Sequence, residues 1–435
     1  MELMLVLMVM IFLLLHTSYP LGYGESASRP IGYGESASRP LGYGESAAVR
    51  VNKVLSSHPI IDGHNDFPMG VRDLLNSDMS LLNFDGDLTK EEPWASYSFN
   101  HVDIPRMRKG KMGGQFWSAY INCNSQYKDA TQKFIEQIDL IRQIVNKYPE
   151  DLMWADNAAD VELAISKGKI ASLVGVESGH AIGSSMAVLR TLYSMGARYM
   201  TLTHGCNTPW ADAAQVEDRS LPSRVNGLSD FGVKIVQEMN RLGMLVDLSH
   251  VSSDAMRKAI KASSAPIMFS HSSARALVAN PRNVPDDVLR MVKENRGIVM
   301  VNFYSCFLVQ ECKTQNASVI DVVKHINHIR RIAGVDYIGI GADYNGVDVT
   351  PTDLPDVSSY PNLFIALIKD TEFKWTDEDL GKLANGNIIR VFKEVESVRD
   401  KLAKEGKKPD NTWIPDKDIG EEGNETECIS KNFLY

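Results

Sequence analysis

From about residue 58 onward, the chain alternates between short apolar runs and longer stretches in which apolar residues recur every three or four positions. The short runs have the length and the β-branched and aromatic content of buried strands, and eight of them are found: 59–64, 115–121, 170–177, 198–204, 243–250, 266–271, 297–303 and 336–343. The longer stretches between them have the period of amphipathic helices. They predict helices over 130–147, 185–195, 230–242, 253–262 and 320–333.

This alternation predicts an α/β fold with a parallel sheet. Because no linker-like change in composition interrupts it, we predict a single catalytic domain over 51–405 that folds as a (β/α)8 TIM-type barrel. A doubly wound open sheet is the alternative, since a count of eight strands does not exclude it. Helical periodicity over 376–383 and 387–402 predicts helices that close the domain, and 406–435 is expected to be a C-terminal tail.

The beginning of the chain differs from this pattern. Residues 4–15 form an unbroken apolar run, shorter than the about 20 residues that cross a bilayer but typical of a secretory signal. We therefore predict a signal peptide over 1–20 and a secreted protein; a short signal anchor is the alternative, because Glu2 stands where a basic residue is usual. Three copies of a decapeptide rich in Gly and Ser follow over 21–50. They predict a flexible spacer, since they have too little apolar side chain to fold.

Composition and charge narrow the possible functions. The 435 residues include 46 Lys and Arg against 55 Asp and Glu, which gives a net charge of −9, and 44% are hydrophobic. Without a concentrated basic face, nucleic acid is not an expected partner. The same composition excludes collagen-like, coiled-coil and multi-span membrane proteins. Function must therefore be inferred from particular side chains.

Cysteines and glycosylation sequons support an extracellular location. The five cysteines contain no Cys-x-x-Cys pair, so neither a zinc ribbon nor a thioredoxin-type site is expected, and disulfides are favoured. Their odd number leaves one cysteine over. Asn316 and Asn424 each begin an Asn-x-Ser/Thr sequon in a polar stretch, which predicts glycosylation at the surface.

The ends of the predicted strands carry the residues that indicate chemistry. Imidazole and carboxylate side chains end these strands or follow them directly: His64, Asp66, Glu177, His204, His250, His271 and Asp343. In a barrel these positions converge on the C-terminal mouth, where such enzymes place their active sites. A single buried histidine is more often a core residue than a ligand. Four histidines and three carboxylates together, however, would be costly to desolvate unless they bind metal.

The residue types in this group indicate zinc. Imidazole nitrogens and carboxylate oxygens suit Zn²⁺, and their mixture also tolerates Mn²⁺ or Co²⁺. His64 and Asp66, two residues apart just past a strand, can turn inward together and hold one ion. His250 and His271 would hold a second ion, with Glu177 between the two. Two ions about 3.5–4 Å apart can share a hydroxide and polarise a substrate carbonyl, so we expect two zinc ions and hydrolytic chemistry.

Other candidate residues receive structural interpretations. His325 and His328 are three residues apart in a helical stretch far from any strand end, and we interpret them as helix-surface residues. Gly339 and Gly341 lack the third glycine of a dinucleotide site, which favours barrel packing. No Gly-x-Ser-x-Gly occurs, so serine hydrolysis is not expected.

Segments in order along the whole barrel region resemble the membrane (renal-type) dipeptidases, zinc enzymes of the amidohydrolase-like barrel group. The matching segments are 61–68 (IDGHNDFP), 113–118 (GGQFWS), 175–177 (GVE), 202–212 (LTHGCNTPWAD), 246–251 (VDLSHV), 269–273 (FSHSS), 282–287 (RNVPDD) and 299–304 (VMVNFY). The likeness runs from about residue 50 to 400.

The resemblance implies the same metal ligands that the strand ends predict, and it adds roles in substrate binding. It implies that His204, Arg282 and Asp343 contact the substrate. Arg282 suits a bidentate grip on the free C-terminal carboxylate of a dipeptide. His204 can donate to the developing oxyanion, and Asp343 can move a proton from the nucleophile to the leaving amine. Together with the bridging Glu177, His204 and Asp343 are the expected catalytic residues.

The family also implies disulfides and an assembly. Its members are usually disulfide-linked homodimers on a lipid anchor. Cys123 and Cys206 match one intrachain bridge of the family, and Cys428 resembles its interchain cysteine. A further cysteine of the relatives is missing here, so Cys306 and Cys312 must pair otherwise, with each other as one option. No hydrophobic tail of the kind a lipid anchor needs is evident.

The leading hypothesis is a secreted dipeptidase that cleaves dipeptides by means of a hydroxide bridging two zinc ions. The expected partners are a dipeptide or small peptide-conjugate substrate and a second copy of the chain, with attachment to the cell surface as the alternative to secretion. A metal amidohydrolase acting on another small amide would use the same ligands. A catalytically inactive binding protein on the same barrel is the hypothesis from a different functional class.

Overall fold

The computed structural model of the protein describes residues 46–312 and 314–419. The predicted signal peptide, nearly all of the repeat region and the end of the tail lie outside these residues, and so do Asn424 and Cys428. Within the part that is described, no helix combines the length and the apolar character needed to cross a membrane.

In the described residues, nine parallel strands form one sheet in the order β2-β1-β9-β8-β7-β6-β5-β4-β3, and β2 also pairs with β4. This last pairing closes all strands except β3 into a barrel, which confirms the predicted fold and excludes the open sheet. Each barrel strand overlaps one of the predicted runs, and every residue in it is buried, as expected for a parallel barrel. The barrel strands are β1 (Ile60–Asn65), β2 (Met112–Tyr120), β4 (Ile170–Glu177), β5 (Ala197–Thr201), β6 (Leu245–Asp247), β7 (Met268–Phe269), β8 (Ile298–Val301) and β9 (Ile338–Ile340).

One strand, β3 (Leu152–Trp154), is not predicted by the hydrophobic pattern. It pairs with the first residues of β4, on the edge that β5 occupies further along, so it takes no part in closing the barrel. Its three residues are too few to show a strand period, and two of them are only partly buried.

Helices cover the outside of the barrel, and several begin where the sequence supplies a cap. α6 (Met186–Ser194), α7 (Asp230–Leu242) and α8 (Ser253–Ala262) each follow a serine whose hydroxyl accepts a hydrogen bond from a backbone N–H in the first turn. Such a cap stabilises a helix by about 1 kcal/mol. Together with α4 (Ala130–Lys147) and α11 (Val319–Ile332), these helices confirm those predicted between the strands.

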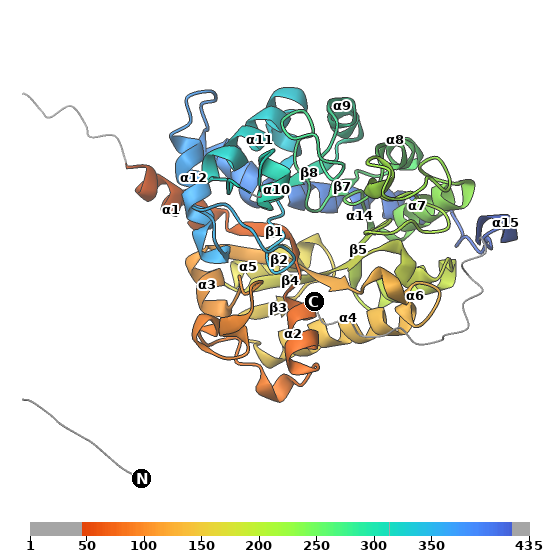
Figure 1. The fold of residues 1–435 in the computed structure, drawn as a ribbon, viewed down its shortest axis with the longest axis horizontal. Coiled ribbons are helices and arrows are strands. Elements are labelled where there is room, and N and C mark those ends of the chain that lie inside the picture. Colours follow the sequence, from red (N-terminus) through yellow and green to blue (C-terminus); the bar gives the residue numbers. More distant parts are fainter. Residues whose placement is uncertain (1–45, 313, 420–435) are drawn as a thin grey trace, which may run out of the picture. The chain divides into compact units, whose positions relative to one another are not determined.

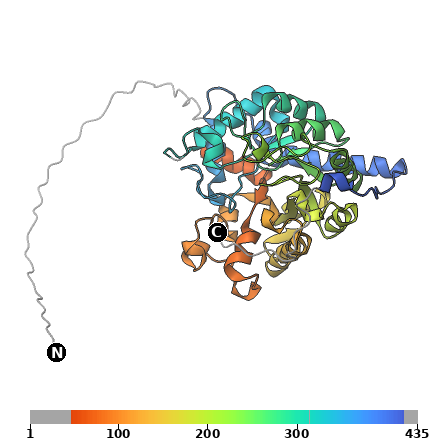
Figure 2. The ribbon, with the colours of Figure 1, turned by 45° about the vertical axis from the view of Figure 1, so that its right-hand side comes forward.

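The described residues form ten further α-helices. They are α1 (Ala47–Ser57), α2 (Phe67–Leu75), α3 (Ile104–Lys109), α5 (Ala158–Ser166), α9 (Asp286–Asn295), α10 (Ser305–Leu308), α12 (Tyr360–Ile368), α13 (Asp377–Gly381), α14 (Asn387–Lys404) and α15 (Asp416–Ile419). Both views show α2, α3 and α4 on the opposite side of the strands from α8, α9 and α11 (Figure 1, Figure 2).

The predicted closing helices, α13 and α14, cover the end of the barrel away from its mouth. They are joined by a π-helical turn at Lys382–Gly386. The side-chain amide of Asn385 donates to the carbonyl of Pro59, just before β1, at 2.8 Å, and that of Asn387 donates to the carbonyl of Ile338 in β9, also at 2.8 Å. The first residues of these strands are thereby fixed, which leaves their carboxyl ends as the open face of the barrel.

Candidate metal centre

The predicted strand-end residues meet at the mouth of the barrel, with Glu177 at the centre of the group. Its Oε1 atom lies 3.0 Å from Nε2 of His250 and 3.6 Å from Nε2 of His271. Its Oε2 atom lies 3.4 Å from Nε2 of His64. The two oxygens of one carboxylate thus face imidazoles from three different parts of the barrel.

Each oxygen of Glu177 has its own set of neighbours. On the Oε2 side, Nε2 of His64 lies 3.1 Å from Oδ2 of Asp66 and 3.8 Å from Oδ1 of Asp343. On the Oε1 side, the Nε2 atoms of His250 and His271 are 2.8 Å apart. The two predicted ligand sets are not separate, however: the ring centroids of His64 and His271 lie only 3.9 Å apart, so the division of the ligands between two ions stays a prediction.

Burial and neighbouring charges shift the pKa values of the residues in this group. Burial lowers the pKa of His250 and of His271 well below the ordinary value, and the nearby charge of Arg282 adds to the effect. Both imidazoles are therefore neutral at pH 7 and have a lone pair to offer. Burial also opposes ionisation of Glu177, but the surrounding imidazoles, His64 first among them, outweigh it and hold the pKa of this carboxyl well below its usual range.

Two residues of the site have a strained backbone. His250 and Asp343 lie in the left-handed region, with φ of 65° and 68°. For residues other than glycine this conformation costs about 1–3 kcal/mol. Asn302 donates to Oδ2 of Asp343 at 2.8 Å and holds it in place. Burial raises the pKa of Asp343 to about 7, with the charges of Asp66 and Glu177 acting in the same direction.

Several observations indicate that these residues are suited to bind divalent metal ions. Oδ1 of Asp66 and Nδ1 of His250 are buried without a hydrogen-bond partner among the described residues. All five predicted ligands belong to groups of three side chains whose ligand atoms lie within 4.8 Å of one another. These groups are His64 with Glu177 and His271, Glu177 with His204 and His250, and His64 with Asp66 and Asp343. Nitrogen and carboxylate oxygen donors in this mixture suit zinc.

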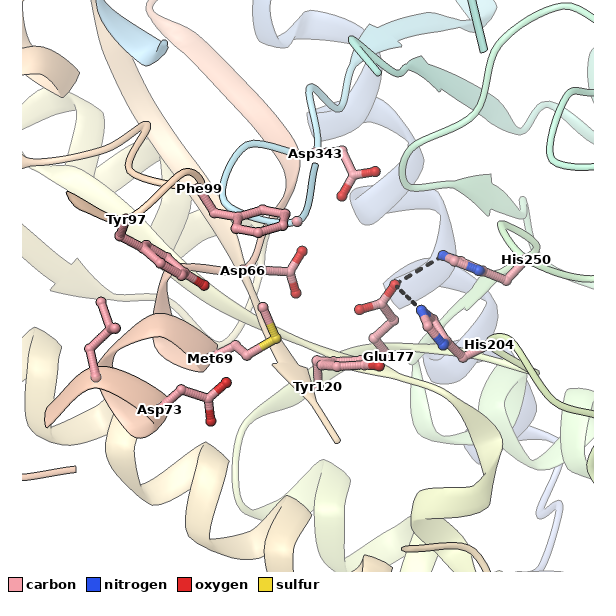
Figure 3. Close-up of a pocket in the computed structure, with 12 residues that line it drawn as sticks. Asp66, Met69, Asp73, Tyr97, Phe99, Tyr120, Glu177, His204, His250 and Asp343 are labelled. Atoms are coloured by element: carbon pink, nitrogen blue, oxygen red, sulfur yellow. Dashed lines mark ion pairs between the residues drawn. The ribbon is translucent and has the colours of Figure 1, made fainter. Parts of the chain in front are cut away.

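His204 lies beside this group. Its Nε2 is 3.7 Å from Oε1 of Glu177, and its ring centroid is 4.3 Å from that of His250 and 4.8 Å from that of Tyr120. Figure 3 shows His204 and His250 side by side, both directed toward Glu177. Burial lowers the pKa of His204, so the neutral ring retains one N–H donor at the mouth.

Arg282 brings a buried positive charge next to the candidate metal ligands. Its Nη2 donates to the backbone carbonyl of His271 at 3.5 Å, and the guanidinium packs over the ring of Phe307 at 5.3 Å. Its Nη1 is buried without a hydrogen-bond partner in the described part of the chain. Burial lowers the pKa of Arg282 to about 10, so the group stays charged at pH 7. It lies beside His271 and is not among the residues that line the pocket in front of Glu177.

That pocket has a volume of about 300 Å³, which fits a small molecule. One side consists of polar residues at strand ends and in the loops that follow them: Asp66, Glu177, His204, His250 and Asp343. The other side consists of α2, the end of β2 and the segment before α3: Met69, Asp73, Leu74, Tyr97, Phe99 and Tyr120. Figure 3 shows Asp73 at the end of the pocket away from His204 and His250.

Two buried aspartates inside the barrel hold the backbone next to the site, and the sequence pattern does not single them out. Asp62 accepts hydrogen bonds from the N–H of His64 at 2.8 Å and from the N–H of the residue before Asp343 at 3.0 Å. Asp247 in the same way accepts from the N–H of the residue before His271 at 2.8 Å. Each aspartate therefore fixes backbone on two neighbouring strands.

Further contacts orient the imidazole rings. The hydroxyl of Tyr199 lies 2.7 Å from Nδ1 of His64, and the hydroxyl of Ser270 lies 2.8 Å from Nδ1 of His271. Such contacts leave the other ring nitrogen to face the centre. The ring of Tyr199 crosses β4 at Gly175, where a Cβ atom would lie 1.9 Å from a ring carbon. Only glycine leaves room for the tyrosine at this position.

The helix-surface interpretation is wrong for His325. The residue is buried, its Nδ1 accepts from the N–H of Ala274 at 3.0 Å, and its Nε2 lies 3.3 Å from the carbonyl of Leu308. The face of α11 that carries it packs on the loops after β7 and β8, which helical spacing alone does not reveal. His328 is partly exposed and contacts Asp286 at 2.7 Å.

The described residues contain two disulfides. Cys123–Cys206 joins the segments that follow β2 and β5, as the family resemblance implies, and it occupies both sulfurs next to His180. Cys306 and Cys312 pair with each other, which decides the alternative that the sequence leaves open. Asn316 is exposed, so its sequon is accessible, and its glycosylation stays a prediction.

Comparison with known proteins points to one family. The profile of the family described as membrane dipeptidase (peptidase family M19) matches residues 48–406. Dipeptidase 3 of Rattus norvegicus is 39% identical over 365 residues, which cover 84% of this chain and 70% of the relative.

Solved structures with the same fold support this result. A metallopeptidase from Rhodobacter sphaeroides, liganded with a phosphinate mimic of the dipeptide L-Ala-D-Ala, has a TM-score of 0.67 at 23% identity and covers 78% of this chain and 99% of its own. The probable dipeptidase PvdM from Pseudomonas aeruginosa has a TM-score of 0.68 at 18% identity, with coverages of 81% and 99%. At these identities the likeness shows the fold. Since the family profile covers most of the chain, the protein belongs to the membrane dipeptidase family, whose members are metallopeptidases.

Proposed function

We propose that the protein is a zinc-dependent dipeptidase that binds two zinc ions and hydrolyses the peptide bond of dipeptides. The observation that carries the proposal is the convergence of imidazoles and carboxylates on Glu177 at the mouth of a barrel from a metallopeptidase family. His64 and Asp66 would hold one ion, and His250 and His271 the other, with Glu177 between them.

Bound zinc would polarise the scissile carbonyl and make water a nucleophile at neutral pH. The protein residues would then handle charge and protons. The N–H of His204 would donate to the carbonyl oxygen as negative charge develops on it. Asp343, with a pKa of about 7, can accept a proton from the attacking water and return it to the leaving amine.

Arg282 would select dipeptides over longer peptides. A dipeptide has its free carboxylate one residue after the scissile bond, and the buried guanidinium beside His271 has an unused donor for it. A longer peptide would place a neutral amide at this distance and leave the charge of Arg282 unpaired, which is costly in a buried site.

The test is a screen of purified, zinc-loaded protein against L,L- and L,D-dipeptides, with and without a chelator. The relative liganded with a mimic of L-Ala-D-Ala supports the inclusion of L,D substrates. We expect hydrolysis that the chelator abolishes and added zinc restores. If every dipeptide stays intact and the chelator makes no difference, the proposal is wrong.

Two alternatives share the barrel and are separated by simple measurements. An amidohydrolase for other small amides would not need a free carboxylate, so Arg282→Ala would change KM equally for substrates with and without one. A catalytically inactive binding protein would hold less than about one zinc ion per chain, which metal analysis of the purified protein measures.

We further propose that the protein is secreted after removal of residues 1–20, with 21–50 as a spacer and 51–405 as the catalytic domain, and that it forms a homodimer. Cys428 would link the two chains, while Asn316 and Asn424 would carry glycans. Electrophoresis of the secreted protein with and without reductant tests the link: Cys428→Ser should convert a covalent dimer to single chains and leave the intrachain disulfides intact.

A further inference from the structure

One face of a helix lines the pocket from the candidate metal ligands to the opposite end. Asp66 lies at the N-cap of α2, and Met69 and Asp73 follow at positions that share its face. Over these two turns the helix rises about 10 Å. Phe67 stacks on Phe84 with ring centroids 4.2 Å apart, so α2 is packed firmly against its surroundings.

Apolar side chains line the route from Asp66 to Asp73. Figure 3 shows Met69 between the two aspartates, with Tyr97 and Tyr120 on opposite sides of it. An aliphatic chain would pack well against these groups. Aromatic faces also attract a cation near them by about 0.5–1 kcal/mol or more.

Asp73 is a carboxylate in this pocket without a matched cation. Within residues 46–312 and 314–419, no hydrogen bond or ion pair joins it to another side chain. Its neighbour Arg72 pairs with Glu136 instead, at 3.0 Å. Partial burial raises the pKa of Asp73, and the charge of the neighbouring Arg72 offsets this only in part.

The proposed activity fixes which part of a substrate reaches Asp73. The dipeptide carboxylate would lie at Arg282, next to β7, which is separated from β1 by β8 and β9 in the sheet. The scissile carbonyl would lie at Glu177. The substrate α-amino group is only two bonds from that carbonyl and so stays close to the candidate ligands. Two side chains remain. That of the C-terminal residue leaves from the carbon that carries the carboxylate held at Arg282, so that of the N-terminal residue is the one placed to follow α2.

We propose that this face of α2 is the subsite for the N-terminal side chain and that Asp73 selects a cationic one, such as that of lysine or ornithine. The aliphatic stem packs on Met69 between Tyr97 and Tyr120, and the ammonium pairs with the carboxylate of Asp73. This inference rests on the proposed dipeptidase activity and adds the substrate class.

The test compares Lys-Ala with norleucine-Ala, which has a similar aliphatic stem without the charge, and with Glu-Ala. We expect kcat/KM for Lys-Ala to exceed that for norleucine-Ala by about tenfold, the effect of one charged hydrogen bond. Asp73→Asn should bring this ratio close to one, and Asp73→Lys should make Glu-Ala a better substrate than Lys-Ala. A ratio near one in the unmodified protein, or a ratio that Asp73→Asn leaves unchanged, overturns the subsite.

Asp85→Asn is the matched control. It removes the same charge from an exposed residue that does not line the pocket. The Lys-to-norleucine ratio should persist in it; loss of the ratio there would mean that the overall field of the protein, and not a local pair, sets the preference.

The subsite and the dipeptidase activity can fail separately. If Ala-Ala is hydrolysed but lysine gives no advantage, only the subsite is wrong. If none of the dipeptides is hydrolysed, the proposed function is wrong. Phosphinate mimics of Lys-Ala and norleucine-Ala, with binding read as a thermal shift, then decide the subsite without turnover: equal shifts overturn it, and a larger shift for the lysine mimic that Asp73→Asn removes supports it.

Discussion

The two sides of the pocket are built in different ways. On one side, Glu177 is the last residue of a barrel strand, and the backbone near its histidine neighbours is held from inside the barrel by Asp62 and Asp247. On the other side, Asp73 and Met69 project from α2, which lies outside the strands and is only partly buried on this face. The barrel thus fixes the candidate metal ligands, while the proposed subsite lies on a segment that can change without disturbing the core.

The largest effect is expected on the strand-end side. His250→Ala removes one imidazole next to Glu177, so bound zinc should fall from about two ions per chain to about one, and kcat/KM for Ala-Ala should drop at least about a thousandfold. Metal analysis and a dipeptide assay measure both. His328→Ala, which changes a histidine of α11 that contacts Asp286, is the control and should keep metal and activity. Retention of both ions by His250→Ala would refute the ligand assignment.

The two disulfides provide a second contrast. Cys123–Cys206 closes 83 residues of chain, whereas Cys306–Cys312 closes only six. Because the chain entropy removed from the unfolded state grows with loop length, replacing the first pair by serine should lower the free energy of unfolding by about 4.5 kcal/mol and the second by about 2 kcal/mol. Urea unfolding of the two double variants measures the difference. A larger loss for the shorter loop would contradict this account.

The buried His325, which lies outside the pocket, makes the free energy of unfolding depend on pH independently of the candidate metal ligands. Burial lowers the pKa of His325 to about 4, below the about 6.5 of an unfolded chain. Above pH 6.5 the ring is neutral in both states. As the pH falls from 6.5 toward 4 the unfolded chain binds a proton that the folded chain does not, which lowers the free energy of unfolding by about 3 kcal/mol at most.

His325→Gln, which cannot titrate, tests this sign. Its free energy of unfolding should decrease less than that of the unmodified protein between pH 7.5 and 4.5, as measured by urea unfolding. The candidate metal ligands are the same in both proteins, so the difference between the two isolates His325. Equal decreases would show that the ring does not titrate as its burial implies.

The smallest predicted effect concerns substrate binding. Arg282→Ala should raise KM for Ala-Ala by about ten- to a hundredfold, because a charged hydrogen bond to the carboxylate is lost. KM for the amide of Ala-Ala, which lacks the carboxylate, should change little. Arg282→Lys keeps the charge but not the forked geometry and should recover part of the loss. An equal rise for both substrates would assign Arg282 a structural role only.

The sequence alone predicts the barrel and its mouth well, for a physical reason. Parallel barrel strands are buried on both faces, so they stand out as continuous apolar runs, and a residue such as His64 or His271 at the end of a run can be placed without knowing the neighbouring strands. β3 escapes the pattern because its three residues show no period.

The supporting residues of the site are not predictable in this way. Asp62 and Asp247 support the site because they accept hydrogen bonds from backbone N–H groups next to adjacent strands. Which residues of adjacent strands lie side by side cannot be read from a single sequence. The same holds for Asp73, whose place in the pocket depends on how α2 packs, and for His325, whose helix face is decided by the loops it meets.

The close approach of Tyr199 to Gly175 has a consequence for how relatives of this protein are judged. A homologue can retain all the candidate metal ligands and still carry alanine in place of this glycine. The tyrosine ring would then have to leave its position across β4, and the contact that sets the orientation of His64 would go with it. A checklist of ligand residues would score such a protein as an intact enzyme. Glycine at position 175 is therefore as informative about the site as the candidate ligands are, because it leaves the space that Tyr199 needs behind His64.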